Sequence, residues 1–252
     1  MTKTLLLLLG ILSYFNATAQ KLDNCTQCSS KKYEQRNLTE NKLYEIVLLR
    51  NEIFARHHYS FKNQRLQEYY EQYNWYHPYP KQPIKQVHLN STEQWNVDLF
   101  KAKEKAIKKN RALLENALKQ LKQVIVRHDE AAIQTIFNNV VEKSSPTLYL
   151  ELVRVLEKVF RSININDINW HKGRAQYEIR IDNGFSISSK SIHLEGNTIS
   201  VLYTNPMTNS SLMEDDAFEY PSDYHSEEEN TIGAEFELKN GKLLLVRLIL
   251  AG

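Results

Sequence analysis

The sequence predicts an α+β protein, with an N-terminal all-helical module and long closing helix, then helices packed on an antiparallel sheet. Apolar residues recur at helical spacing from residue 37 to about residue 161, and from residue 165 they alternate with a period of two. A length of 252 residues fits one large domain or two small ones, and the composition, 42% hydrophobic and 25% charged, is typical of globular proteins. This composition excludes a disordered, collagen-like or polytopic membrane protein.

Helix-start signals divide the first half. Asn37-Leu38-Thr39-Glu40 resembles a capping box and predicts a helix that ends near His57. A second, shorter helix is expected after Asn63, and an aromatic, Pro-containing loop follows it. Ser91 with Gln94 resembles another capping box and predicts a long closing helix past residue 120. The expected apolar face of that helix is Trp95, Leu99, Ala102, Ala106, Leu113, Ala117 and Leu121.

The second half changes from helical to strand patterning. Amphipathic segments predict helices near 128–141 and 146–161, and Pro146 suits the first turn of the second one. Strands are expected from residue 165 onward, with turns at 182–184 and 195–197. Asn240-Gly241 between two alternating segments predicts a type I′ hairpin.

The N-terminus predicts export. Residues 1–19 combine Lys3, an apolar run of 11 residues and the cleavage pattern Ala17-Thr18-Ala19, which together are typical of a signal peptide. We therefore expect a periplasmic or extracellular protein. No later run reaches about 18 apolar residues, so no transmembrane segment is expected after signal cleavage.

The mature chain is expected to begin with a flexible polar segment, residues 20–36, which contains Cys25 and Cys28. In an exported protein such a pair can oxidise, and we expect a local disulfide. A structural zinc site needs four ligands, and nothing nearby supplies the other two. No metal site is predicted.

Charge is distributed unevenly although the net charge is only +2, which argues against a nucleic-acid partner. Residues 101–127 carry nine basic and two acidic side chains, and residues 214–237 carry ten acidic and no basic ones. Three interpretations stay open: a solvated helix face and loop, attraction between the two segments within the fold, or binding of a charged envelope polymer.

The segment from Leu49 to Phe61 places charged residues on an amphipathic helix. Arg50 falls in the middle of the apolar stripe, where an unpaired charge would cost several kcal/mol. Glu52 and Arg56 are four residues apart and can form an ion pair. Arg50 and Glu52 are therefore candidate structural pins.

Arg56, His57, Trp75 and Tyr76 are the candidate ligand-binding residues. Aromatic faces stack on sugars, and Arg and His side chains bind hydroxyl and carboxylate groups. One interpretation is that these residues line a cleft for an envelope ligand such as a glycan. The other is structural: Arg50 and His57 would hold the first helix to the aromatic loop that contains Trp75 and Tyr76.

The eight residues Arg50-Asn51-Glu52-Ile53-Phe54-Ala55-Arg56-His57 resemble the signature of the YARHG domain, an extracellular bacterial module. The similarity continues through 61–63, 66–70 and Trp75-Tyr76, and more weakly through 89–104. Phe54 stands where the family has Tyr, and His58 where it has Gly. The resemblance implies export and a helical module, and it implies no activity because the molecular role of the family is unsettled.

The C-terminal half is similar in architecture to the NTF2-like α+β folds, in which helices and a sheet enclose a concave pocket. Trp170, His171 and Tyr203 are the residues expected near such a pocket, although a core role for Trp170 and Tyr203 is the simpler expectation. This similarity concerns architecture and implies no function.

No catalytic motif such as GxSxG or HExxH occurs, so no catalytic residue and no cofactor are predicted. We expect a signal peptide, a flexible segment, a YARHG-like helical domain at 37–125 and an α+β domain at 126–252. The leading hypothesis is an exported, non-enzymatic envelope-associated binding protein. Its partner would be cell-wall glycan or another envelope protein. The alternatives are a structural or adaptor protein, and an enzyme with a site in the C-terminal pocket.

Overall fold

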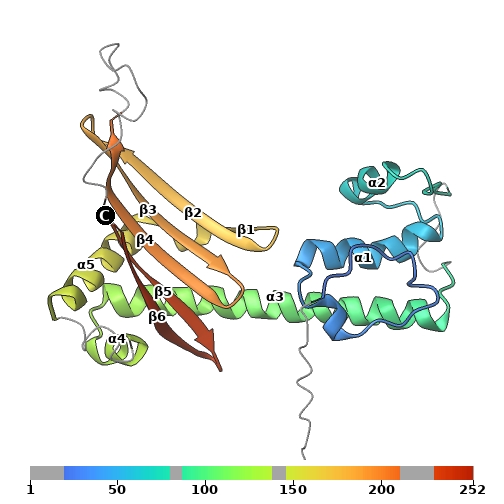
Figure 1. Cartoon of the computed structure of the whole chain (residues 1–252), viewed down its shortest axis with the longest axis horizontal. Helices are drawn as coiled ribbons and strands as arrows, with labels where there is room; N and C mark the ends of the chain where they lie inside the picture. Colours follow the sequence, from blue (N-terminus) through green and yellow to red (C-terminus); the bar gives the residue numbers. More distant parts are fainter. Residues whose placement is uncertain (1–19, 80–86, 138–145, 211–229, 252) are drawn as a thin grey trace, which may run out of the picture. The chain divides into compact units, whose positions relative to one another are not determined.

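The computed structural model describes residues 20–79, 87–137, 146–210 and 230–251 (Figure 1). These residues form two compact units, an N-terminal unit mainly within 20–101 and a C-terminal unit mainly within 102–251. The helices are η1 (Gln35–Leu38), α1 (Leu43–Arg56), α2 (Gln64–Glu71), α3 (Ser91–Val126), α4 (Glu130–Phe137), α5 (Pro146–Ser162) and η3 (Ile165–Asp167). The strands are β1 (Asn169–His171), β2 (Arg174–Asp182), β3 (Ser186–Glu195), β4 (Thr198–Asn209), β5 (Thr231–Lys239) and β6 (Lys242–Ala251).

The predicted α+β class is confirmed, because helices fill the first half and an antiparallel sheet the second. None of the helices in the described ranges is long and apolar enough to cross a bilayer. The predicted signal peptide and most of the acidic segment 214–237 lie outside the described residues. The domain limits 37–125 and 126–252 stay predictions, because compactness alone does not show which segments fold independently.

The first helix begins at Leu43 and not at residue 37 as predicted. The reason is that polar side chains just before the helix bind the start of the described chain. The Thr39 hydroxyl accepts a hydrogen bond from the Gln20 N–H at 2.9 Å. The Asn41 side chain accepts from the Leu22 N–H at 2.9 Å and donates to the Leu22 carbonyl at 2.8 Å.

Helix α1 ends in a Schellman motif built on a histidine. His58 has φ = 57°, in the left-handed region that favours glycine. Its N–H donates to the Ala55 carbonyl at 3.0 Å, and the Tyr59 N–H donates to the Phe54 carbonyl at 3.1 Å. The geometry of a glycine cap is therefore retained with His58 in that position, at the steric cost of a Cβ atom.

Asparagine residues cap the next two helices. The Asn63 side chain accepts from the N–H groups of Arg65 and Leu66 at the start of α2, which begins where predicted. At the start of α3, Asn90 accepts from the Glu93 N–H, and the Glu93 carboxylate accepts from the Asn90 N–H, both at 2.9 Å. The capping box therefore lies one residue before the predicted Ser91/Gln94 pair.

The predicted apolar face of α3 is partly wrong. Trp95 is 51% exposed and Leu113 is 47% exposed, and Ala102 and Ala106 also face solvent. The helix contributes to two cores, whereas the prediction fitted one continuous stripe to its whole length. Its buried apolar residues are Val97 and Phe100 in the N-terminal unit and Leu114, Ala117, Leu118, Leu121 and Ile125 in the C-terminal unit.

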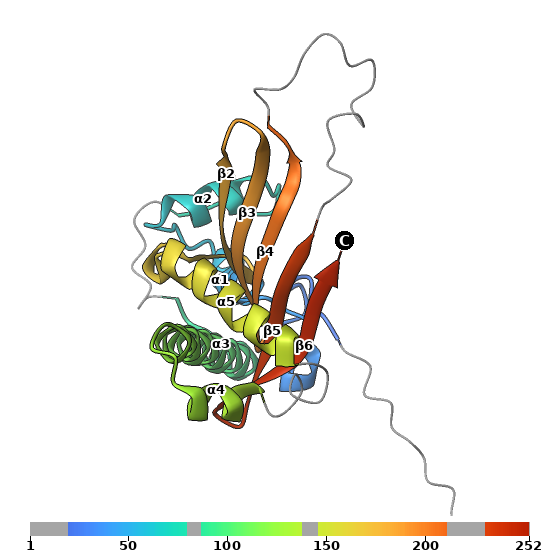
Figure 2. The ribbon, with the colours of Figure 1, turned by 90° about the vertical axis from the view of Figure 1, so that its left-hand side faces the viewer.

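The C-terminal sheet is a meander in which each of the six strands pairs antiparallel with the next along the chain (Figure 1). The β5–β6 turn has positive φ at Asn240 (52°) and Gly241 (74°), which is the pattern of the type I′ hairpin that the sequence predicts. Helix α5 lies across one face of the sheet (Figure 2). The core between helices and sheet includes Leu121, Phe137, Leu156, Phe160, Ile192, Val201 and Phe236.

Candidate functional site

Glu52 is the buried polar centre of the N-terminal unit. Only 9% of the residue is exposed. One carboxylate oxygen accepts from the Arg56 Nε–H at 3.0 Å and Nη2–H at 2.6 Å, and the other accepts from the Cys25 N–H at 2.9 Å. The predicted Glu52–Arg56 contact is thus present, with the Glu52 side chain 12% exposed and that of Arg56 31% exposed. Glu52 connects helix α1 to the segment that precedes it.

That segment contains a disulfide between Cys25 and Cys28, whose Cα atoms are 5.0 Å apart. Each residue is only 1% exposed. The buried Asn96 side chain, from α3, accepts from the Tyr33 N–H and donates to the Cys28 carbonyl, both at 2.9 Å. Residues 20–36 were expected to be flexible, but the structure gives them fixed hydrogen-bond partners on two helices.

Arg56 lies against the aromatic side chains of the unit. Its guanidinium carbon is 4.5 Å from the centroid of the Trp75 ring, a cation–π contact. Trp75 in turn stacks on Tyr73, with centroids 5.4 Å apart and planes 30° apart. The Tyr73 hydroxyl donates to that of Tyr69 at 3.0 Å. The hydrogen bonds to Glu52 hold the guanidinium over the indole ring.

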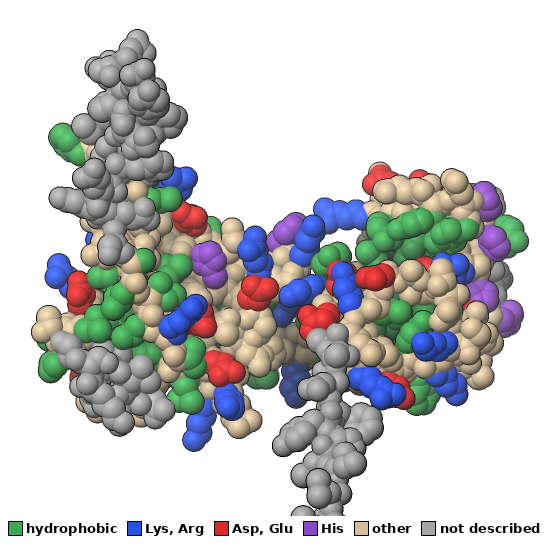
Figure 3. Space-filling view, viewed as in Figure 1, with side chains coloured by type: hydrophobic (Ala, Val, Ile, Leu, Met, Phe, Trp, Pro, Cys, Tyr) green, Lys and Arg blue, Asp and Glu red, His purple; other side chains and the backbone are tan. Residues whose placement is uncertain are grey.

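These groups line a cleft of about 180 Å³. The helix and loop that follow α1 supply the aromatic wall, and the disulfide segment supplies polar groups. In the space-filling view, hydrophobic side chains, a class that includes Tyr and Trp, gather on the surface of this unit near α2 (Figure 3). The lining residues are Asp23, Asn24, Thr26, Glu52, Arg56, Tyr69, Tyr70, Tyr73 and Trp75.

His57 does not line this cleft. Its Nε2 atom lies 3.0 Å from a carboxylate oxygen of Glu93, which also closes the capping box of α3. The His57 side chain is 32% exposed and that of Glu93 only 9%. The contact joins the end of α1 to the start of α3, so the His57 side chain links two helices and does not face the cleft.

Tyr76 is also outside the cleft, and it is 5% exposed. Its hydroxyl lies 2.7 Å from the Tyr59 carbonyl and 2.9 Å from the Gln67 side-chain oxygen. Burial raises the pKa of the Tyr76 hydroxyl, so it stays protonated and acts as a donor. Of the four predicted ligand residues, the structure brings Arg56 and Trp75 into one cleft and gives the other two internal partners.

The half-buried Arg50 lies near the Tyr70 hydroxyl. Burial and the charge of Glu52 raise the pKa of Tyr70, while the charge of Arg50 opposes this rise. The Tyr70 hydroxyl donates to the Leu48 carbonyl at 2.6 Å. A pinning role for Arg50 therefore remains a prediction, whereas the contacts of Glu52 are those of a pin.

Several lining residues were missed from the sequence. Tyr69 and Tyr73 are four residues apart, a spacing that places them on one helix face, but this spacing does not indicate whether that face lines a cleft or a core. Asp23, Asn24 and Thr26 carry no sequence signal, because only the contacts of the disulfide loop with Glu52 and Asn96 bring them to α1.

The YARHG domain model matches residues 17–105. The chain carries a YARHG domain. This is a family of exported, extracellular-type bacterial domains, so the resemblance seen in the sequence is confirmed. The match includes the disulfide segment and begins before the predicted limit at residue 37. No curated protein and no solved structure matches the chain, and the NTF2-like similarity stays a prediction.

Proposed function

We propose that this protein is an exported, non-enzymatic binding protein of the bacterial envelope and that the aromatic cleft of its YARHG domain binds cell-wall glycan. The observation that carries the proposal is the Arg56 guanidinium held between the Glu52 carboxylate and the Trp75 ring at the edge of that cleft. Both groups are positioned before any ligand arrives. A preorganised site loses less entropy on binding.

The lining groups suit a sugar. Trp75 and Tyr73 offer aromatic faces, and Tyr73 is 39% exposed. Glu52 engages Nε and Nη2 of Arg56, which leaves Nη1 to donate to a hydroxyl or carboxylate oxygen. Thr26 and Asn24 add a hydroxyl and an amide group to the lining, and the Thr26 hydroxyl donates to the Asn24 side-chain oxygen at 2.7 Å. A volume of about 180 Å³ is below that of pockets for drug-sized ligands and favours a single sugar ring.

The carboxylates of the cleft support binding and not hydrolysis. Glycoside hydrolysis uses a pair of carboxyl groups, one as general acid and the other as base or nucleophile. Asp23 is exposed and lies 3.8 Å from the Lys21 ammonium. Glu52 already accepts three hydrogen bonds, from Cys25 and Arg56. The Glu52 carboxylate is therefore committed to contacts within the unit.

The experiment is co-sedimentation of the mature chain, residues 20–252, with isolated cell-wall sacculi at low and high salt. Tyr73→Ala and Trp75→Ala remove the aromatic faces of the cleft. Tyr79→Ala is the matched control, because Tyr79 is a 57% exposed tyrosine of the same unit and does not line the cleft. Circular dichroism checks that every variant is folded.

We expect retention that persists at high salt, that weakens about tenfold in the two cleft variants and that is unchanged in Tyr79→Ala. Absence of retention would contradict the proposal. Retention that salt abolishes equally in all four proteins would also contradict it, and would favour the adaptor alternative, in which contacts depend on surface charge.

A further inference from the structure

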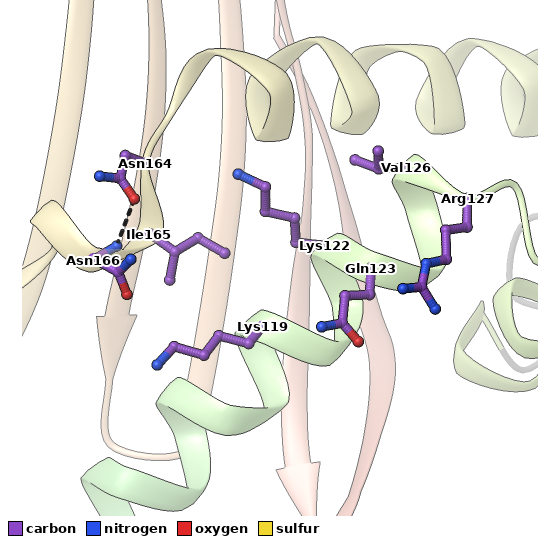
Figure 4. A pocket seen from close by; sticks show the side chains of 8 residues that line it. All are labelled: Lys119, Lys122, Gln123, Val126, Arg127, Asn164, Ile165 and Asn166. Carbon is purple, nitrogen blue, oxygen red and sulfur yellow. Dashed lines mark hydrogen bonds between the residues drawn. The ribbon is translucent and has the colours of Figure 1, made fainter.

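The C-terminal unit contains a second cleft, whose lining carries positive charge. It has a volume of about 460 Å³ and lies between the end of α3 and the segment that leads from α5 into η3 (Figure 4). Lys119 and Lys122 extend from α3 toward Asn164 and Asn166 across the cleft (Figure 4). The lining residues are Lys119, Lys122, Gln123, Val126, Arg127, Asn164, Ile165 and Asn166, with no Asp or Glu among them.

The basic groups of this cleft are not neutralised within the described part of the chain. Neither Lys119 nor Arg127 has an ion pair or side-chain hydrogen bond there. Lys122 donates one hydrogen bond, to the Ile163 carbonyl at 3.0 Å, which leaves two of its protons available. Three cations that line one cleft repel one another, and a bound anion would offset this repulsion.

Two basic residues nearer the middle of the same helix, Lys108 and Arg111, do have partners. Lys108 lies 4.0 Å from a carboxylate oxygen of Glu104. The Arg111 guanidinium stacks 4.3 Å from the Trp170 ring centroid and donates to a backbone carbonyl. Glu115, which lines a smaller neighbouring cleft, accepts from the Trp170 indole N–H at 2.6 Å. This neighbouring cleft shares Lys119 with the basic cleft, but Glu115 forms no ion pair with Lys119 in the described part of the chain.

We propose that this basic cleft is an anion site that binds a phosphate group. A phosphate monoester carries a charge of about −1.5 to −2 at neutral pH and offers several acceptor oxygens. Two lysines, an arginine fork and the Gln123 and Asn164 amides offer matching donors. The Asn164 side-chain oxygen already accepts from the Asn166 N–H at 3.2 Å, so its NH₂ group is the part available to a ligand. The site is independent of the aromatic cleft.

Isothermal titration of the mature chain with inorganic phosphate, at constant ionic strength, tests the proposal. Lys119→Gln/Arg127→Gln removes two charges from the cleft. Lys105→Gln/Lys109→Gln removes two charges from exposed positions on the same helix outside the cleft. A second arm uses vesicles of phosphatidylcholine with and without phosphatidylglycerol, which separates a lipid headgroup from a soluble phosphate as the source of the group.

We expect saturable phosphate binding that weakens at least tenfold in the cleft variant and by less than twofold in the control variant. Binding to phosphatidylglycerol vesicles with the same dependence on the cleft would identify a lipid headgroup, and its absence would identify a soluble ligand. No saturation up to about 10 mM phosphate would overturn the proposal. Equal weakening in both variants would also overturn it, because the effect would then be that of net charge.

Discussion

Replacement of Glu52 by alanine should destabilise the N-terminal unit strongly. The carboxylate is the common acceptor for the Cys25 N–H and for two N–H groups of Arg56. Truncation to alanine leaves the first donor without a partner in the interior and removes the charge that holds Arg56 over Trp75. The disulfide segment would also lose a principal contact with α1.

The expected cost is about 3 kcal/mol. A hydrogen bond to a charged group contributes about 1.5–3 kcal/mol, and a buried donor left without a partner costs about 1–3 kcal/mol. The Arg56 side chain is 31% exposed, so water recovers part of its loss. Glu52→Gln keeps one acceptor oxygen and should cost about half as much. For a urea dependence of about 1–3 kcal/mol/M, the alanine variant should unfold about 1–3 M urea earlier.

Urea unfolding can be followed by tryptophan fluorescence in a Trp170→Phe background. The chain has three tryptophans, and this change leaves only Trp75 and Trp95, both in the N-terminal unit. Glu68→Ala is the control, because Glu68 is an exposed acid of α2 whose side chain accepts from Gln64. The control should change the free energy of unfolding by less than about 0.5 kcal/mol. A similarly small effect of Glu52→Ala would refute the role assigned to Glu52.

Three further changes have defined outcomes. Reduction of the Cys25–Cys28 disulfide should lower the free energy of unfolding by about 2 kcal/mol, since the closed loop is short; an unchanged urea midpoint in reductant would contradict this. Tyr70→Phe removes the hydroxyl that donates to the Leu48 carbonyl and should cost about 1–1.5 kcal/mol in the same assay, whereas no cost would show that the hydrogen bond is not stabilising. Burial lowers the pKa of His193, so the unfolded chain binds more protons than the folded chain. Stability from this group is complete above the ordinary His pKa of about 6.5 and falls as pH drops below it, so His193→Gln should lose less stability between pH 8 and 5 than the wild type; parallel losses would contradict it.

The sequence predicts much of the fold because periodicity and turn residues act locally. Pro146 correctly predicts the start of α5. Asn240-Gly241, between two segments of period two, correctly predicts the last hairpin. The start of α1 and the buried face of α3 were mistaken because tertiary contacts decide them. The Asn41 side chain binds the backbone of Leu22 just before α1 begins, and α3 supplies two cores with different residues.

The candidate site is only partly predictable for the same reason. Helical spacing predicts the Glu52–Arg56 contact, and the aromatic content of the following loop indicates Trp75. Nothing local distinguishes Tyr76, whose hydroxyl points into the unit, from Trp75, whose ring lines the cleft. The contribution of the disulfide segment depends on hydrogen bonds that span 27 residues between Cys25 and Glu52.

The most direct test of glycan binding at the aromatic cleft is ¹⁹F NMR of the mature chain labelled with 5-fluorotryptophan. Single Trp→Phe variants assign the three resonances. On addition of soluble peptidoglycan fragments, we expect the Trp75 resonance to shift in a saturable way, while those of Trp95 and Trp170, which do not line the cleft, stay in place. An unchanged Trp75 resonance at fragment concentrations that saturate binding would contradict the proposed site, and no binding at all would contradict the proposed function.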